Sequence, residues 1–141
     1  MSETIAASAV VYRGAGILIR GAPGTGKSTL ALMLIEDGGR LVGDDRIHIG
    51  ACHGRLIASG HGVIAGQIEL RGRGPAECPF EPSVIIRLVV DLVPREAFDR
   101  LPEPDALTAI LLGVRLPRQA IAANSPAAPM LVRHALDAIR R

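Results

Sequence analysis

The residues with the clearest chemical potential form a glycine-rich segment that fits the pattern G-x-x-x-x-G-K-[ST]. The segment is GAPGTGKS, residues 21–28, called the P-loop below. Glycines allow backbone N–H groups to turn inward around phosphate oxygens, and a following helix presents the positive end of its dipole. Lys27 would place a cation at the β and γ phosphates, and Ser28 would offer a hydroxyl to Mg²⁺. The pattern predicts a phosphate-binding loop, and the alternative is a structural turn before a helix.

Lysine usage favours the chemical role. Lys27 is the only lysine in 141 residues, although arginine occurs fifteen times. A planar guanidinium is too wide for the interior of such a loop, whereas an ammonium on a flexible stem fits there as a point charge. We therefore favour phosphate binding over a plain turn.

Phosphoryl transfer also needs carboxylates for a metal ion and a base for an alcohol acceptor, and the chain offers two candidate sites. Asp91 ends an apolar strand, as in a Walker B motif, with a solvent-facing strand end as the alternative. Asp44 and Asp45 lie 17 and 18 residues after Lys27, at the end of an expected strand. Adjacent strand residues point to opposite faces, so one aspartate would serve the metal and the other the acceptor. The alternative for this pair is an exposed polar turn.

A third polar cluster, QIELRGRG, spans 67–74. Glu69 and Arg71 are two residues apart, which places a carboxylate and a guanidinium on one strand face. Considered alone, this cluster is as consistent with a strand and turn as with a site.

Local patterns place the P-loop between a strand and a helix. Two apolar segments, 8–12 and 17–20, flank a glycine turn and predict a hairpin. Within 27–36 the apolar residues share one helical face, and Gly38 and Gly39 follow as a stop signal. Strand, loop and helix in this order are the context that a phosphate-binding loop requires.

Further strands and a second helix are expected downstream. The almost continuously apolar run 83–93 predicts a central strand that is covered on both faces. Ser125 is expected to cap a final helix, with Pro126 in its first turn. The glycine-rich stretch 59–82 predicts a long surface segment, and such segments are often functional. Shorter strands or apolar runs are expected over 40–42, 46–49, 55–58 and 109–112.

Composition limits the class of protein. A chain of 141 residues, 48% hydrophobic and 21% charged, predicts one globular domain over 1–141 and argues against disorder or a coiled coil. The net charge of +2 comes with scattered arginines, and only three residues are aromatic, so neither a nucleic acid nor a membrane is an expected partner. Cys52 and Cys78 have no CxxC spacing, and 1–4 lack a signal-peptide pattern. A cytoplasmic protein with free thiols is therefore expected.

Four segments in order resemble the catalytic domain of HPr kinase/phosphorylase. They are GAPGTGKS, GGRLVGDD, IELRGRG and FDRL, which begin at Gly21, Gly38, Ile68 and Phe98. The likeness covers 5–116 and is especially close to the short alphaproteobacterial type without an amino-terminal domain. The P-loop alone is unspecific, but RLVxDD and E-x-R-G-x-G at this spacing are distinctive.

The resemblance implies a fold and an activity. The fold would be α/β, a single P-loop domain similar to phosphoenolpyruvate carboxykinase, with a mixed sheet and flanking helices. The activity would be that of an ATP- and Mg²⁺-dependent serine kinase, and in reverse a phosphorylase, that acts on the phosphocarrier protein HPr or a paralogue. The family assembles as hexamers, so a homo-oligomer is a further expectation.

The resemblance also implies roles for individual residues. Lys27 would be the phosphate lysine, and Ser28 and Glu69 would be the Mg²⁺ ligands. Asp45 would be the base that deprotonates the target serine, and the acid in the reverse direction. The nucleotide-binding residues would be Gly21, Ala22, Pro23, Gly24, Thr25, Gly26, Lys27, Ser28 and Thr29.

Two further residues complete the expected active site. Asp44 would support the metal through water. Arg100 falls in the FDRL segment, where the family has an active-site arginine, and its alternative is a surface arginine.

The chain departs from the family pattern at several positions. Ala6 stands where the family has a histidine, and Thr29 stands where it has an acidic residue. The late glycine-arginine-asparagine segment of the long forms has no counterpart. These losses bear most directly on the phosphorylase reaction, which we expect to be weak. The four histidines, none of which replaces the missing one, are expected to be surface or turn residues: His48, His53, His61 and His134.

Two rival functions remain at this point. One is a generic P-loop kinase of small molecules that uses Asp91 as its Walker B residue. The other is a nucleotide-binding regulator with little or no turnover. The replacement of the family's histidine by Ala6 makes this alternative credible.

Overall fold

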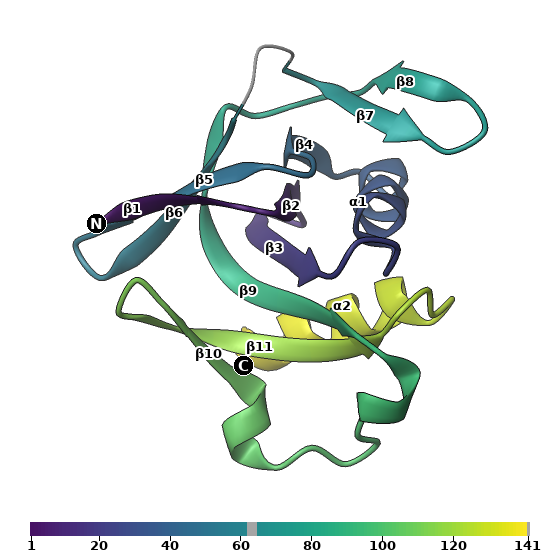
Figure 1. Ribbon diagram of the computed structural model, residues 1–141. Coiled ribbons are helices and arrows are strands. Elements are labelled where there is room, and N and C mark those ends of the chain that lie inside the picture. Colours follow the sequence, from purple (N-terminus) through teal and green to yellow (C-terminus); the bar gives the residue numbers. More distant parts are fainter. Residues whose placement is uncertain (62–64, 141) are drawn as a thin grey trace.

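An eleven-residue strand, β9 (Ser83–Val93), lies at the centre of a mixed sheet. The computed structural model describes residues 1–61 and 65–140. Within them, β9 pairs through its first residues with β6 (Arg55–Gly60), which is antiparallel to it. Further along, β9 pairs in parallel with β3 (Ala15–Gly21) on one side and β11 (Val114–Ala122) on the other. The sheet curls around these strands (Figure 1).

The other strands extend this sheet or stand apart from it. β2 and β4 continue beyond β3, β5 and β1 continue beyond β6, β10 pairs with β11, and β7 and β8 form a separate antiparallel hairpin. Their bounds are β1 (Ser2–Ile5), β2 (Ala7–Tyr12), β4 (Arg40–Gly43), β5 (Ile47–Cys52), β7 (Gln67–Leu70), β8 (Gly74–Glu77) and β10 (Thr108–Leu111). Two short 3₁₀ helices, η1 (Arg95–Ala97) and η2 (Pro104–Leu107), lie between β9 and β10.

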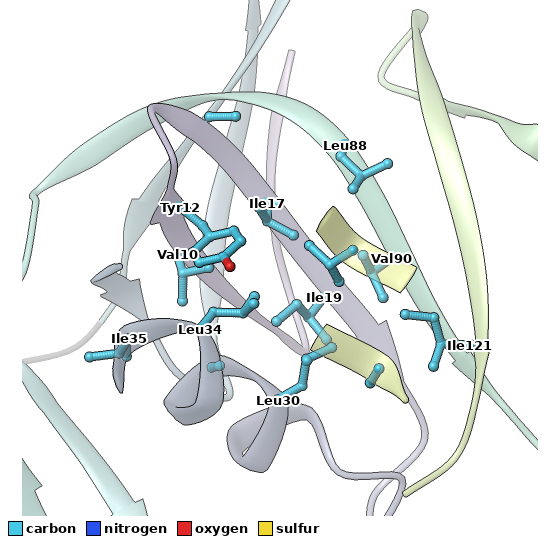
Figure 2. Packing of buried hydrophobic residues seen from close by; sticks show 14 of the residues in the cluster. Val10, Tyr12, Ile17, Ile19, Leu30, Leu34, Ile35, Leu88, Val90 and Ile121 are labelled. Atoms are coloured by element: carbon cyan, nitrogen blue, oxygen red, sulfur yellow. The ribbon is translucent and has the colours of Figure 1, made fainter. Parts of the chain in front are cut away.

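Two α-helices cover one face of the sheet. They are α1 (Lys27–Glu36) and α2 (Ala128–Ile139), and they lie on the same side of it (Figure 1). Leu30 and Leu34 of α1 belong to a buried cluster with Ile19 of β3 and Val90 of β9 (Figure 2). Because α1 packs on the strand that precedes it, the loop between them is held at both ends.

A second buried cluster covers the opposite face of the same strands. It includes Leu18 of β3, Ile49 of β5 and Leu56 of β6. On β9, Val89 belongs to this second cluster, while Val90 faces the helices. The expectation of a central strand covered on both faces is confirmed.

The predicted start of the chain is also confirmed. The hairpin is β2 and β3, and the expected helix over 27–36 is α1. The helix ends in a left-handed glycine: Gly38 has φ +99°, and its N–H donates to Ile35 at 3.0 Å. Gly39 N–H donates to the Leu34 carbonyl at 2.9 Å, which satisfies a further terminal carbonyl.

The glycine-rich stretch 59–82 contains more structure than expected. The hairpin of β7 and β8 lies within it, and Ile68 of β7 is 1% exposed and joins the cluster that contains α1. Residues 62–64 of this stretch lie outside the described residues.

The expected start of the final helix is wrong. The helix α2 begins at Ala128, and the proline in its first turn is Pro129. Ser125 closes a separate turn before it, because its Oγ accepts a hydrogen bond from Ala127 N–H and its carbonyl accepts one from Ala128 N–H, each at 3.2 Å. Neither α-helix in the described ranges has the length and apolar character needed to cross a membrane.

Candidate functional site

A cleft of about 710 Å³ opens beside the P-loop. Three other segments contribute to its walls: the residues after β4, the β7–β8 hairpin and the turn before α2. Most of the expected site residues meet here, and the lining includes Pro23, Gly24, Gly26, Lys27, Ser28, Thr29, Asp44, Asp45, Glu69, Arg71, Arg73 and Asn124. A smaller hollow of about 220 Å³ adjoins it and shares Asp44.

The P-loop adopts a conformation that requires glycine at particular positions. Gly26 has φ +99°, a backbone conformation that residues with a side chain rarely adopt. A Cβ at Gly26 would also lie 2.9 Å from Asn124 Oδ1, and a Cβ at Gly21 would lie 2.5 Å from Thr25 Oγ1. The glycines of the motif therefore serve the local backbone path and its close neighbours.

The side chain of Lys27 is directed back onto the loop. Its Nζ donates hydrogen bonds to the carbonyls of Gly21 at 2.7 Å and Ala22 at 3.3 Å. This places the cation over the start of the loop, within the cleft. The ammonium has three donors on a flexible stem, so it can exchange these carbonyls for phosphate oxygens.

Ser28 lies directly against Asp44. Its Oγ donates to the Asp44 carboxylate, at 2.9 Å from Oδ1 and 3.0 Å from Oδ2. A second hydroxyl, Ser8 Oγ, donates to Asp44 Oδ1 at 2.6 Å. Ser8 is 0% exposed and is the one buried polar residue among those that the structure describes. The Asp44 carboxylate is therefore fixed in place beside the first turn of α1.

Asp45 lies in a different backbone environment from the one expected. Both aspartates lie in a bend after β4 and not within a strand, and Asp45 has φ +70°. The explanation by strand alternation is therefore wrong, because neither aspartate is part of a strand. Asp45 is exposed at the cleft, and its carbonyl accepts a hydrogen bond from Ala7 N–H at 3.2 Å. Position 6, held by Ala6, is therefore adjacent to the residue bonded to Asp45.

Glu69 reaches the cleft from the β7–β8 hairpin. It is exposed on β7, one residue after the buried anchor Ile68, and Arg71 and Arg73 of the same hairpin also line the cleft. The structure thus gives this cluster a place in the site, which its sequence alone left open. Glu69 lines a different wall of the cleft from Ser28 and Asp44.

Asp91 lies outside the cleft lining and is occupied by two arginines. Arg20 donates to it from Nε at 2.7 Å and from a terminal nitrogen at 2.9 Å, and Arg118 donates from Nε at 2.5 Å. Burial raises the pKa of the Asp91 carboxyl, but hydrogen bonds and charge from Arg20 and Arg118 outweigh burial and hold the pKa below its ordinary value of 3.8. This arrangement joins three adjacent strands, β3, β9 and β11, through charged side chains, which disfavours a Walker B role.

Arg100 is not among the described residues that line the cleft. It is exposed, in the segment between η1 and η2. The histidines also lie elsewhere: His48 and His53 are in or next to β5, His134 is on α2, and His61 borders the smaller hollow.

One residue of the cleft, Asn124, was not indicated by the sequence. It lies in the turn before α2 with φ +57°, and its Nδ2 donates to the Gly24 carbonyl at 3.1 Å. Its backbone N–H donates to the Thr25 carbonyl at 3.0 Å. Asparagine tolerates this left-handed backbone, so the residue type indicates a turn. It does not indicate the contact with Gly24, because the two residues are 100 positions apart.

Strand β3, the P-loop and helix α1, set in a mixed sheet with two acidic segments at the cleft, place the chain in the class of P-loop α/β domains. The model of the HPr Serine kinase C-terminal domain family matches residues 1–131. The chain belongs to this family.

Individual relatives agree with this assignment. The HPr kinase/phosphorylase of Clostridium tetani is 48% identical over 66 residues, which are 47% of this chain and 22% of that protein. The HPr kinase/phosphorylase of Chlorobium phaeobacteroides is 35% identical over 121 residues, which are 78% of this chain and 35% of that protein. The matches thus span about a fifth to a third of the length of these relatives.

A solved structure has the same fold. The Hpr(Ser) kinase/phosphatase from Coxiella burnetii superimposes with a TM-score of 0.83 and 29% identity, over 98% of this chain and 90% of that one. The expected fold, similar to phosphoenolpyruvate carboxykinase, is confirmed.

Proposed function

We propose that this chain is an ATP- and Mg²⁺-dependent kinase that phosphorylates a serine of an HPr-type phosphocarrier protein. The observation that carries the proposal is the convergence of Lys27, Ser28, Asp44, Asp45 and Glu69 on one cleft, from three segments far apart in the sequence. Membership of the family and the names of its relatives support the choice of acceptor.

The residues at the cleft fit a magnesium ion that arrives with a nucleotide. Mg²⁺ is bound by oxygen ligands, usually one or two carboxylates together with substrate phosphates. Ser28 and Glu69 supply a hydroxyl and a carboxylate, and Asp44 already holds the Ser28 hydroxyl. The described residues contain no preformed group of three acidic, histidine or cysteine ligands, which agrees with a site completed by phosphate oxygens. The bound ion would neutralise charge on the phosphates during transfer.

The chain's own residues then have distinct tasks. The P-loop and Lys27 hold the β and γ phosphates. Asp45 accepts the proton of the acceptor serine hydroxyl. At the same time, the serine oxygen bonds to the γ-phosphorus and ADP leaves. The exposed position of Asp45, at the cleft and one residue beyond the hydrogen-bonded Asp44, supports this division: one carboxylate is held in place and the other is free to meet a protein acceptor.

The rival reading as a generic small-molecule kinase loses its Walker B residue, because Asp91 is held by Arg20 and Arg118. The reading as a regulator without turnover uses the same cleft and is separated by experiment. Purified chain, [γ-³²P]ATP, Mg²⁺ and purified HPr should yield labelled HPr, and a serine-to-alanine HPr variant should not be labelled. ATP binding without any transfer would replace the kinase with the regulator, and absence of ATP binding would remove both.

A further inference from the structure

We infer that Asn124 is a positioning residue that holds the P-loop in its nucleotide-binding conformation, acting through the loop and not on the reacting atoms. The inference rests on the proposed nucleotide site. Its basis is a pair of hydrogen bonds from one residue to two successive carbonyls of the loop, at Gly24 (3.1 Å) and Thr25 (3.0 Å).

The geometry of the peptide group gives these two bonds their consequence. In a planar trans peptide, the C=O and the N–H of the next residue point in opposite directions. Asn124 holds the carbonyls of Gly24 and Thr25, so the N–H groups of Thr25 and Gly26 are turned away from Asn124. A phosphate-binding loop depends on the directions of such N–H groups. Asn124 therefore fixes two N–H directions on which the affinity for a nucleotide phosphate depends.

Within the loop itself, Thr25 supplies the support for these peptides, since its Oγ1 donates to the Ala22 carbonyl at 2.7 Å. Thr25 N–H adds one long bond, to the same Ala22 carbonyl at 3.3 Å, and the flanking residues Gly24 and Gly26 lack a Cβ and so have wide backbone freedom. A loop rich in glycine has many accessible conformations. The hydrogen bonds from Asn124 reduce the number of these conformations before the ligand binds.

Asn124 is itself held in place by contacts of the neighbouring residues. The preceding residue, Ala123, donates from its N–H to the Val93 carbonyl at 2.7 Å, and the turn that contains Ser125 leads directly into α2. Close packing adds to the hydrogen bonds, because Asn124 Oδ1 occupies the space that a Cβ at Gly26 would need. The end of β9, the end of β11 and the start of α2 thereby support one residue that touches the loop.

The residue type matches both requirements of the position. Asn124 has φ +57°, which glycine and asparagine tolerate better than other residues, and its amide supplies the donor that reaches Gly24. Asn124→Gly keeps the backbone conformation and the bond to Thr25 but removes the side-chain donor. Asn124→Asp keeps the shape and replaces the donor with a charged acceptor.

The test measures binding of Mg·ADP to the full chain by calorimetry. Asn124→Gly should bind about three- to tenfold more weakly, the range expected for loss of one neutral hydrogen bond. Asn124→Asp should bind more weakly still, because its carboxylate opposes both the carbonyl and the phosphates. His53→Gly is the matched control: His53 also has positive φ, +52°, but lies in the β5–β6 turn, and it should bind as the unsubstituted chain does.

Kinetics distinguish positioning from a general loss of structure. The KM for ATP should rise in Asn124→Gly, while the KM for HPr and the melting temperature should match those of His53→Gly. Unchanged Mg·ADP binding in both Asn124 variants would overturn this inference and leave the proposed function intact. Absence of Mg·ADP binding by the unsubstituted chain would overturn the proposed function, and the inference with it.

Discussion

Ser8 donates a hydrogen bond from a fully buried hydroxyl on β2 to Asp44 Oδ1 at 2.6 Å, across 36 residues of sequence. Asp44 in turn accepts the hydroxyl of Ser28. A buried polar group is costly unless it is paired, so the bond ties the sheet interior to the acidic end of the cleft.

Ser8→Ala should therefore weaken phosphoryl transfer without changing the residues that meet the nucleotide. A hydrogen bond to a charged group contributes about 1.5 to 3 kcal/mol, which corresponds to about a 10- to 100-fold loss if all of it serves the position of Asp44. The measurement is the transfer rate to HPr as a function of Mg²⁺ concentration. Ser2→Ala, at an exposed position of β1, is the control, and equal rates in the two variants would contradict the prediction.

Lys27→Ala should reduce ATP affinity by about tenfold or more and nearly abolish transfer, since it removes the cation proposed for the β and γ phosphates. Its hydrogen bonds go to loop carbonyls and not to the hydrophobic clusters, so the melting temperature should change little. Lys27→Arg should not restore activity, because the guanidinium is too wide for the loop. Calorimetry with ATP checks both variants, and wild-type affinity in Lys27→Ala would remove the P-loop assignment.

Asp45→Asn should retain ATP binding yet lose transfer by about 10²- to 10⁴-fold, the usual contribution of a general base. Asp45 is exposed, so the substitution should not change stability. Single-turnover transfer to HPr, with ATP affinity measured in parallel, is the check. A loss of ATP affinity in place of the rate would assign Asp45 to nucleotide binding.

Asp91→Asn should act on stability and its pH dependence and should leave the transfer step nearly unchanged. The Asp91 carboxylate pairs with Arg20 and Arg118 and has a pKa below 3.8 in the folded chain, so its contribution is present above the unfolded-state pKa and is lost as pH falls through the folded one. At pH 7 the loss should be about 2 to 4 kcal/mol, slightly below that of a fully buried pair because the arginines keep some solvent contact.

Urea unfolding of Asp91→Asn and the unsubstituted chain between pH 3 and 7 provides the measurement. The difference in unfolding free energy should shrink at the acidic end of this range, where the Asp91 carboxyl of the unfolded chain takes up a proton before that of the folded chain does. A difference independent of pH would show that the carboxylate charge is not what stabilises this region.

Ala6→His should raise phosphorylase turnover more than kinase turnover, by about 10²-fold at the lower end of acid–base contributions. Ala6 precedes Ala7, whose N–H donates to the Asp45 carbonyl, so an imidazole at position 6 would adjoin the proposed acid of the reverse reaction. An imidazole can accept the proton of inorganic phosphate near neutral pH, whereas alanine cannot. The assay is loss of phosphoserine from phosphorylated HPr with added phosphate. If the chain with Ala6 already dephosphorylates as fast as it phosphorylates, position 6 has no such role.

Local signals in the sequence predicted the elements that hold the P-loop. The periodicity of 27–36, the glycine stop after it and the apolar run 83–93 each reflect interactions within a short segment or a uniform buried environment. These elements are α1 and β9, with the expected bounds. The position of the acidic pair after β4 agrees with the sequence, but its backbone geometry does not. Asp45 has a positive φ in a bend, and its carbonyl accepts a hydrogen bond from Ala7, which is distant in the sequence.

The contacts that join distant segments could not be predicted in this way. Asn124 and Ser8 are ordinary turn and strand residues in the sequence, and their roles appear only when β11 and β2 are brought to the loop and to Asp44. The same applies to Asp91, which the sequence presents as an acidic strand end and which the fold pairs with two arginines from neighbouring strands.

The long strand β9 has a consequence for how the protein comes apart. Its first residues pair with β6, its later residues pair with β3 and β11, and its side chains enter both hydrophobic clusters. When β9 leaves the sheet, both clusters lose side chains at the same time. The two clusters should therefore unfold together in one cooperative transition. The cleft is attached to that same strand through β3 and through the turn before α2, and it should therefore disappear in the same step.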